Sequence, residues 1–334
     1  MLRRIRLIVA LVFFILITLL FLDFTGTLHA WFGWLAKIQF LPAVLALNVG
    51  VILLWVVLTL VFGRVYCSVI CPLGVFQDVV SWFSGRRKKK KYRFSYSPAV
   101  SWLRYGVLGV FIIAMIAGIG SVVALLAPYS SYGRIVSNLF APVYQWGNNV
   151  LAYFAERSDS YAFYETSVWL KSLPTFIIAA VTFVIIVVFA WRGGRTYCNT
   201  ICPVGTVLGF VARFSWLKPV IDSSKCVNCN LCARNCKASC INIKEHKIDY
   251  SRCVACMNCI GKCHKGAIKY MHPSKSQAKV DASKVEKEQV NNARRGFLAT
   301  TAVLATTSVL KAQEKKVDGG LAVIEDKKVP ERAT

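Results

Sequence analysis

Four long apolar stretches constrain the fold of this sequence more than any other feature. They hold a single charged side chain, Arg6, and they run from Ile5 to Leu22, Phe40 to Phe62, Tyr105 to Ala127 and Pro174 to Trp191. A helix of about 20 apolar residues crosses the hydrocarbon core of a bilayer. The sequence therefore predicts four membrane helices, the first of them retained rather than cleaved as a secretory signal.

Composition supports a membrane protein with basic faces. Of the 334 residues 56% are hydrophobic, and the net charge is +25. A soluble domain this apolar would expose large hydrophobic patches, whereas a disordered basic chain would be poor in large aliphatic residues. Both of these classes are excluded.

The basic residues predict an orientation, because Lys and Arg in short loops stay on the cytoplasmic side. Residues 63–104 hold nine basic residues and one acid. Residues 23–39 hold a single Lys or Arg, Lys37, and residues 128–173 hold three basic and three acidic residues. We expect the N-terminus and the cysteine-rich region in the cytoplasm. The basic run Arg86 to Lys91 is interpreted as a topology anchor that touches anionic lipid, with no nucleic-acid partner.

An internal repeat relates the two halves of the apolar region. A shift of 131 residues superimposes the segment from Gly63 to Ser84 on the segment from Gly194 to Ser215, with eleven of 22 positions identical. Each copy holds a Cys-x-x-x-Cys-Pro motif after an apolar stretch. We expect two repeated hairpins, each presenting its cysteines at the inner membrane surface. The four cysteines are Cys67, Cys71, Cys198 and Cys202.

The prolines predict that Cys71 and Cys202 lie at helix N-termini, because proline suits the first helical position. Free backbone N–H groups there favour thiolate. Two interpretations stay open for the four cysteines: an additional redox, metal or thiol centre, or buried packing residues.

Two copies of the spacing C-x2-C-x2-C-x3-C follow in the last third of the chain. This is the spacing of bacterial two-cluster ferredoxins, in which the fourth cysteine of each motif binds the other cluster. The rule predicts two [4Fe-4S] clusters. The first is assigned to Cys226, Cys229, Cys232 and Cys263, and the second to Cys253, Cys256, Cys259 and Cys236.

Zinc is the competing metal, but a zinc ribbon needs two separated CxxC pairs, whereas each motif here has four cysteines in eleven residues. Lys237 and His264 stand where proline usually follows the fourth cysteine. Cys240 is the thirteenth cysteine and is interpreted as a packing residue. No paired histidines for a haem, no CxxCH and no nucleotide-binding motif occur.

The C-terminal region contains Arg294-Arg295-Gly-Phe-Leu before a short apolar run, a pattern typical of a twin-arginine export signal. An interfacial helix is the alternative. The predicted domains are a four-helix transmembrane domain at 1–215, a cytoplasmic ferredoxin-like domain at 216–272, a linker at 273–293, the signal or interfacial helix at 294–313, and a polar tail at 314–334 that an active signal would place outside.

These motifs resemble the ferredoxin-type membrane proteins of the NapH/MauN kind, and more widely the NosR and FixG/RdxA proteins. The resemblance covers residues 1 to about 272 and implies an all-α polytopic membrane domain joined to a small α+β two-cluster ferredoxin domain. It also implies an electron-transfer subunit of quinol dehydrogenase type in the cytoplasmic membrane, with quinol or quinone as substrate and a periplasmic or membrane redox partner.

Two other functions remain open at this point. One is a metal-centre assembly factor that reduces copper or iron for a respiratory oxidase, and the other is a membrane redox sensor. A sensor needs an output domain, and the sequence shows none. The terminal acceptor and the direction of electron flow do not follow from the sequence.

Overall fold

In the computed structural model, the first of two units ends at His272. The predicted linker, twin-arginine segment and polar tail lie outside the described residues, as does the basic run Arg86 to Lys91. The structure describes residues 2–23, 26–85, 94–157, 165–166, 172–223 and 225–272.

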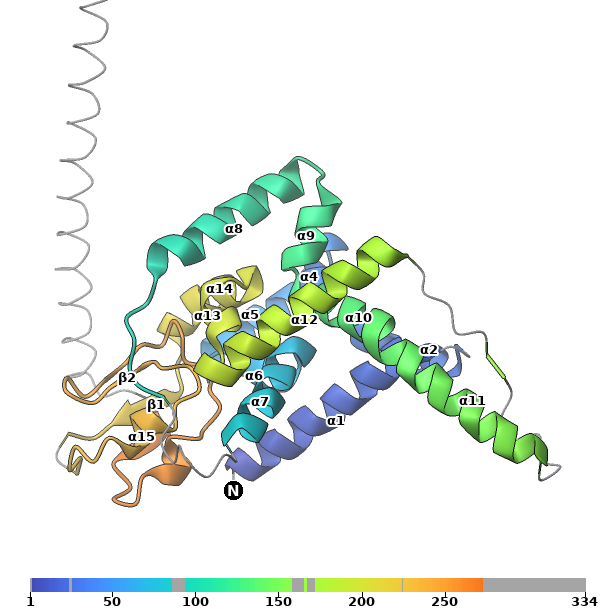
Figure 1. The fold of residues 1–334 in the computed structure, drawn as a ribbon. Coiled ribbons are helices and arrows are strands. Elements are labelled where there is room, and N and C mark those ends of the chain that lie inside the picture. The colour runs from blue at the N-terminus through green and yellow to red at the C-terminus, as the bar shows by residue number, and fades with distance from the viewer. Residues whose placement is uncertain are drawn as a thin grey trace, which may run out of the picture. The chain divides into compact units, whose positions relative to one another are not determined.

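Two helices of the described chain are long and apolar enough to cross a membrane. They are α1 (Leu2–Leu22) and α12 (Leu173–Gly193), each of 21 residues, with a mean hydropathy of 3.0 and 2.7 over their most apolar windows. They coincide with the first and fourth apolar stretches of the sequence. Few residues of either helix are buried, and Figure 1 shows their place in the fold.

The second and third apolar stretches differ from the expected unbroken helices, because each is divided in two. The second becomes α4 (Phe40–Leu45) and α5 (Val49–Phe62), and the third becomes α8 (Ser101–Ile116) and α9 (Gly120–Leu126). Leu47 and Gly118, both with positive φ, lie at the breaks. At 1.5 Å per residue, α5 and α8 are about 21 and 24 Å long, shorter than a typical hydrocarbon core.

The repeat forms two similar halves, and helices of each half pack on helices of the other. The first half contains α5, α6 (Val65–Val69) and α7 (Pro72–Gly85), and the second contains α12, α13 (Thr196–Thr200) and α14 (Pro203–Val211). Helix α12 packs on α7, and α5 packs on α14. In the same way α1 packs on α6 and α7, while α8 packs on α13 and α14. Each half therefore supports the motif helices of the other (Figure 1).

Glycines make the turn into each motif. Gly63 follows α5 and Gly194 follows α12, with φ of 67° and 71°. These left-handed angles favour glycine. The remaining helices described in residues 1–215 are α2 (Thr27–Phe32), α3 (Trp34–Lys37), α10 (Pro128–Ile135), the π-helix η1 (Val136–Phe140), α11 (Ala141–Arg157) and the 3₁₀-helix η2 (Ala212–Phe214).

The cysteine-rich region has its own small core around two strand pairs. Strands β1 (Lys218–Ile221) and β4 (Ile268–Met271) pair antiparallel, as do β2 (Ile241–Asn242) and β3 (Lys247–Ile248). Helix α15 (Leu231–Arg234) and the 3₁₀-helix η3 (Ile260–Lys262) complete it. The core consists mainly of isoleucine and cysteine side chains.

Hydrogen bonds join this region to the end of α5 and to the segment that follows α12. The backbone N–H of Trp216 donates to the Leu60 carbonyl at 2.7 Å, and the Tyr270 hydroxyl donates to the Phe62 carbonyl at 2.6 Å. In the second half, the Arg195 N–H donates to the Lys237 carbonyl at 2.9 Å. The cysteine-rich region is thus joined to both motif segments.

Candidate functional site

One pocket of the cysteine-rich region collects the first set of predicted ligands. Cys226, Cys229 and Cys232 lie along a loop and α15, and Cys263 reaches the same pocket from the end of η3. The pocket has a volume of about 220 Å³. Asn230 adopts a left-handed φ of 59° within the loop.

A second pocket collects the other predicted set. It is lined by Cys236 together with Cys253, Cys256 and Cys259, and its volume is about 20 Å³. Each pocket therefore combines three cysteines of one motif with the fourth of the other. In the part of the chain described, no three His, Cys, Asp or Glu side chains converge closely enough to hold a single metal ion.

Cys240 also lines the second pocket. Its side chain is 1% exposed, and its Sγ lies 3.5 Å from the Sγ of Cys236. This hydrogen bond lowers the pKa of Cys236 to about 7. The interpretation of Cys240 as a packing residue rather than a ligand stays a prediction, but the structure adds a contact with a predicted ligand.

The four CxxxCP cysteines lie on the two motif segments and are all buried. Cys67 is on α6 and Cys198 on α13, while Cys71 and Cys202 immediately precede α7 and α14 as the prolines predicted. Burial raises the pKa of Cys71, Cys198 and Cys202, and neighbouring cysteines raise it further. Backbone N–H groups at the two helix N-termini lower the pKa of Cys71 and Cys202 as expected, but desolvation by burial outweighs them in the free thiols.

Hydrogen-bond donors surround the sulfur atoms. The Gln77 Nε2 lies 3.4 Å from the Sγ of Cys198, and the Gly205 N–H lies 3.3 Å from the Sγ of Cys202. The Arg64 Nη2 lies 3.8 Å from the Sγ of Cys67. N–H donors of this kind suit sulfur ligands that carry negative charge.

An ion-pair network lies beside the cysteines in the first half. Asp78 of α7 pairs with Arg195 and with Arg6, both at 2.8 Å, and with Lys237 at 3.4 Å. Burial alone would raise the pKa of Asp78, but Arg195, Lys237 and Arg6 outweigh it and lower the pKa. Arg195 also donates to the Cys67 carbonyl.

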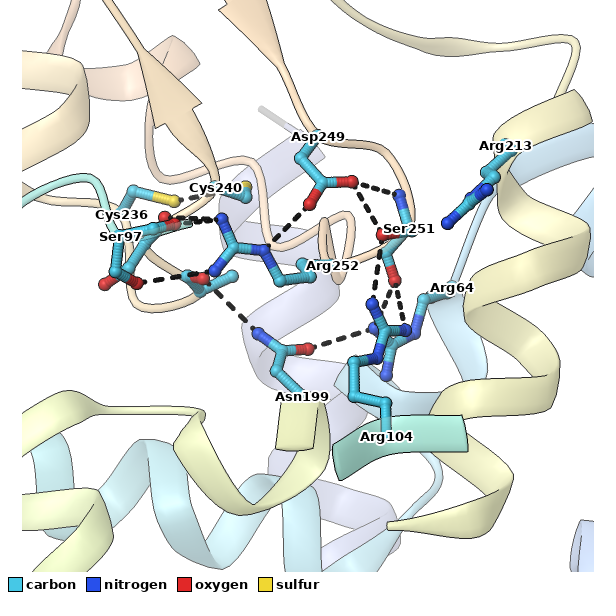
Figure 2. Close-up of polar contacts among 12 residues, drawn as sticks. Arg64, Ser97, Arg104, Asn199, Arg213, Cys236, Cys240, Asp249, Ser251 and Arg252 are labelled. Carbon is cyan, nitrogen blue, oxygen red and sulfur yellow. Dashed lines mark hydrogen bonds and ion pairs between the residues drawn. The ribbon is translucent and has the colours of Figure 1, made fainter. Parts of the chain in front are cut away.

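The corresponding place in the second half holds no carboxylate. Position 209, which the repeat aligns with Asp78, is Gly209, and the Ser251 carbonyl lies against it. Arg64 and Arg104 donate to this carbonyl at 3.1 and 3.2 Å (Figure 2). Arg64 also donates to the Cys198 carbonyl at 3.2 Å, as Arg195 does to that of Cys67.

One feature of the repeat indicates this arrangement in the sequence. Arg64 and Arg195 are identical in the repeat, while Asp78 faces Gly209, so the repeat conserves both cations and loses one acid. No sequence pattern pointed to Arg104 or Ser251, because their contact depends on how the two regions pack.

Comparisons with known proteins place these features in a family. A family model described as a 4Fe-4S binding domain matches residues 44–91 and 175–221, which are the two copies of the repeat. The methylamine utilization ferredoxin-type protein MauN of Paracoccus denitrificans is 24% identical over 210 residues, 62% of this chain and 57% of MauN. The ferredoxin-type protein NapH of Haemophilus influenzae is 26% identical over 176 residues, 52% of this chain and 47% of NapH. The chain is similar to the ferredoxin-type proteins of the NapH/MauN kind.

A third relative extends the comparison. YccM of Escherichia coli is 22% identical over 199 residues, 59% of this chain and 47% of YccM. The chain spans about half the length of the curated relatives that it matches. No solved structure matches it. The family assignment supports 4Fe-4S binding and electron transfer for a protein of this kind.

Proposed function

We propose that this ferredoxin-type protein is a membrane-bound electron carrier with two [4Fe-4S] clusters. Such a cluster supplies one-electron transfer when it is bound. The observation that carries the proposal is the crossed sharing of cysteines between the two pockets. Cys226, Cys229, Cys232 and Cys263 would hold one cluster, and Cys253, Cys256, Cys259 and Cys236 the other.

The crossed sharing has a direct test. Cys226→Ser and Cys263→Ser, although 37 positions apart, should perturb the same cluster in the EPR spectrum of the anaerobically purified full chain. Cys259→Ser, only four positions before Cys263, should perturb the other. If Cys263→Ser and Cys259→Ser affect the same cluster, the assignment is wrong, and a preparation with zinc in place of iron would overturn the proposal.

Quinol is the proposed electron donor in the membrane, or quinone the electron acceptor. An apolar cavity of about 340 Å³ lies among α4, α8, α9 and α10, with Tyr129 and Ser130 at its polar edge. Apolar pockets with a few polar groups are typical of small-molecule sites. Tyr197 donates to the Leu126 carbonyl and packs in the same core as Cys202, so side chains join the cavity to the CxxxCP cysteines.

Filling the cavity tests the quinol proposal. A Cβ at Gly120, which lines the cavity, meets no atom within 4 Å, so Gly120→Leu should fold and reduce the space. We expect quinol-dependent cluster reduction to fall about tenfold. Gly109→Leu, equally open but outside the cavity, is the control. Unchanged turnover in Gly120→Leu would contradict this site, and copper or iron reduction without quinol turnover would favour the assembly-factor function.

The proposed setting is the cytoplasmic membrane, with four crossings and the clusters on the cytoplasmic side. The divided second and third stretches would cross together with neighbouring short helices. Reporter fusions after Trp34 and Asn149 should report the outside, and fusions after Lys90 and Tyr270 the inside. An outside signal after Tyr270 would overturn this orientation.

The CxxxCP cysteines and the C-terminal segment complete the proposal. We propose a third metal or thiol centre at Cys67, Cys71, Cys198 and Cys202, and a periplasmic or membrane protein as redox partner. If Arg294 and Arg295 form an export signal, a reporter fused after Thr334 should appear outside, and replacement of both arginines by Lys should keep it inside. Equal export of the Lys variant would contradict the signal.

A further inference from the structure

The two arginines at the Ser251 carbonyl are buried without a charged partner. Arg64 is fully buried and Arg104 is 2% exposed, and the Nε atom of each lacks a hydrogen-bond partner among the described residues. The ion pairs of the described chain include neither arginine. Asp249, the nearest acid through the Ser251 hydroxyl, already pairs with Arg252 at 2.8 Å (Figure 2).

The other half does not supply the missing negative charge. Asp78 is shared by three cations, so that network is itself positive. Carbonyl oxygens solvate a guanidinium but do not neutralise it. Removing an unpaired charge from water costs several kcal/mol even after relaxation. A fold that retains Arg64 at full burial therefore implies an anionic group beside it.

The CxxxCP cysteines are the groups that can provide this charge. The Arg64 Nη2 contacts the Cys67 Sγ at 3.8 Å, and the same atom donates to the Cys198 carbonyl. Arg195 makes the reciprocal contact with the Cys67 carbonyl. These two cross-links hold the motif helices α6 and α13 together, and Cys67, Cys71 and Cys202 lie in one buried core.

We propose that Cys67, Cys71, Cys198 and Cys202 jointly hold one anionic iron-sulfur centre and that Arg64 is its counter-charge. This inference rests on the proposed function and deepens it, since it assigns a ligand set, a charge and a partner to the third centre. Four thiolates give such a centre a net negative charge. The iron-sulfur class is supported by the 4Fe-4S family match, which covers both CxxxCP segments.

The same arginine connects this centre with one of the two soluble clusters. Arg64 donates to the carbonyl of Ser251, two residues before Cys253. Cys256 packs against the core that contains Cys67, Cys71 and Cys202. The centre therefore neighbours the cluster proposed at Cys236, Cys253, Cys256 and Cys259.

Metal content is the first experiment. The full chain, purified anaerobically, should contain about twelve iron and twelve sulfide, and Cys67→Ser with Cys198→Ser should reduce both to about eight. Equal content in the two proteins, or copper or zinc lost in place of iron, would overturn this inference and leave the two-cluster proposal intact. Absence of iron from both would overturn the proposed function itself.

The counter-charge is tested by redox titration followed by EPR. Arg64→Gln removes one positive charge, so at a fixed solution potential the reduced-to-oxidised ratio of the third centre should fall at least about tenfold. Arg64→Lys should restore most of it. The matched control is Arg195→Gln with Asp78→Asn, which removes a neutral pair from the opposite half and should change the ratio much less.

Two further outcomes decide the assignment. If the neutral-pair control shifts the ratio as much as Arg64→Gln does, Arg64 is not the counter-charge. If Arg64→Gln does not fold, Arg104→Gln is the substitute, because Arg104 shares the Ser251 carbonyl and its hydrogen bonds go to Ser251 rather than to a cysteine sulfur. It should lower the ratio by a smaller factor, and no change in the ratio would overturn the inference.

Discussion

The two halves of the repeat each bring two arginines to one oxygen acceptor, but the acceptor differs in kind. In the first half, Arg6 of α1 and Arg195 converge on the Asp78 carboxylate. In the second, Arg104 of α8 and Arg64 converge on the Ser251 carbonyl. A side-chain acid in one half thus corresponds to a backbone oxygen of the cysteine-rich region in the other.

This difference separates two roles that a simple repeat would combine. The Asp78 half has an internal carboxylate, which also pairs with Lys237 of the cysteine-rich region at 3.4 Å. The Gly209 half has room for the Ser251 segment because it lacks a side chain at that position. Because position 209 is glycine rather than an acid, the Ser251 segment has room to pack there, and Arg64 and Arg104 have no carboxylate partner among the described residues.

Removing the acid from the first half should have the largest effect. Asp78→Asn leaves the buried Arg195 and the partly buried Arg6 and Lys237 without their carboxylate, so the free energy of unfolding should fall by about 3–5 kcal/mol. Unfolding of the detergent-solubilised protein measures this loss. The control is Asp222→Asn, because its pair with Lys225 is long, at 3.9 Å, and exposed. An equally small effect of both variants would show that Asp78 is not the centre of the network.

Adding a side chain to the second half should have the next largest effect. A Cβ at Gly209 would collide with the Ser251 carbonyl, so Gly209→Ala should displace that segment at a cost of about 1–3 kcal/mol. The control, Gly109→Ala on α8, meets no atom within 4 Å and should be neutral or slightly stabilising. Increased proteolysis near Ser251 in Gly209→Ala would report the displacement. Equal stability of the two variants would contradict the close approach.

The cysteines and the helices differ in how far sequence patterns reach. Ligand spacing is local, so the spacing predicts two crossed sets, and Cys236 and Cys263 line the pockets of the other motif's cysteines; the cluster assignment itself stays a prediction. Hydropathy could not reveal the breaks at Leu47 and Gly118, because apolar residues continue across both.

The charge network was beyond sequence analysis for a different reason. Arg64 and Ser251 are 187 positions apart, and no periodic pattern relates them. The helix N-terminus lowers the pKa of Cys71 as the prolines suggested, but the burial that raises it depends on packing that the sequence does not show. Both depend on packing between regions that fold from distant segments.

The pH dependence of stability should distinguish the halves. The pKa of Asp78 lies below its usual value, so its contribution is present above about pH 4 and is lost as the pH falls below that value. The wild-type free energy of unfolding should then decrease more steeply with acid than that of the Asp78→Asn, Arg195→Gln variant. The difference in slope should be at most about 1.4 kcal/mol per pH unit. Parallel curves would mean that Asp78 is not held ionised by its partners.

The smallest effect on stability is expected where the halves differ by a neutral side chain. Gln77 donates to the Cys198 Sγ at 3.4 Å, and its counterpart in the repeat is Leu208. The Gln77 Oε1 is buried without a partner among the described residues, so Gln77→Leu removes a hydrogen bond and an unsatisfied atom together. The two terms offset, and the free energy of unfolding should change by less than about 1 kcal/mol.

The same substitution should nevertheless alter the third centre, because a hydrogen bond to a ligand sulfur raises the reduction potential. Gln77→Leu should therefore make that centre harder to reduce in a redox titration while the soluble clusters stay unchanged. Gln39→Leu is the matched comparison, since Gln39 is equally buried, its Nε2 also lacks a partner among the described residues, and its Oε1 accepts a 2.8 Å hydrogen bond from the Tyr66 hydroxyl. That variant should lose about 1–3 kcal/mol of stability, because the hydroxyl is left without its acceptor. A larger stability loss in Gln77→Leu than in Gln39→Leu would mean that the bond to Cys198 serves folding, and the difference between the halves at this position would then be structural rather than electronic.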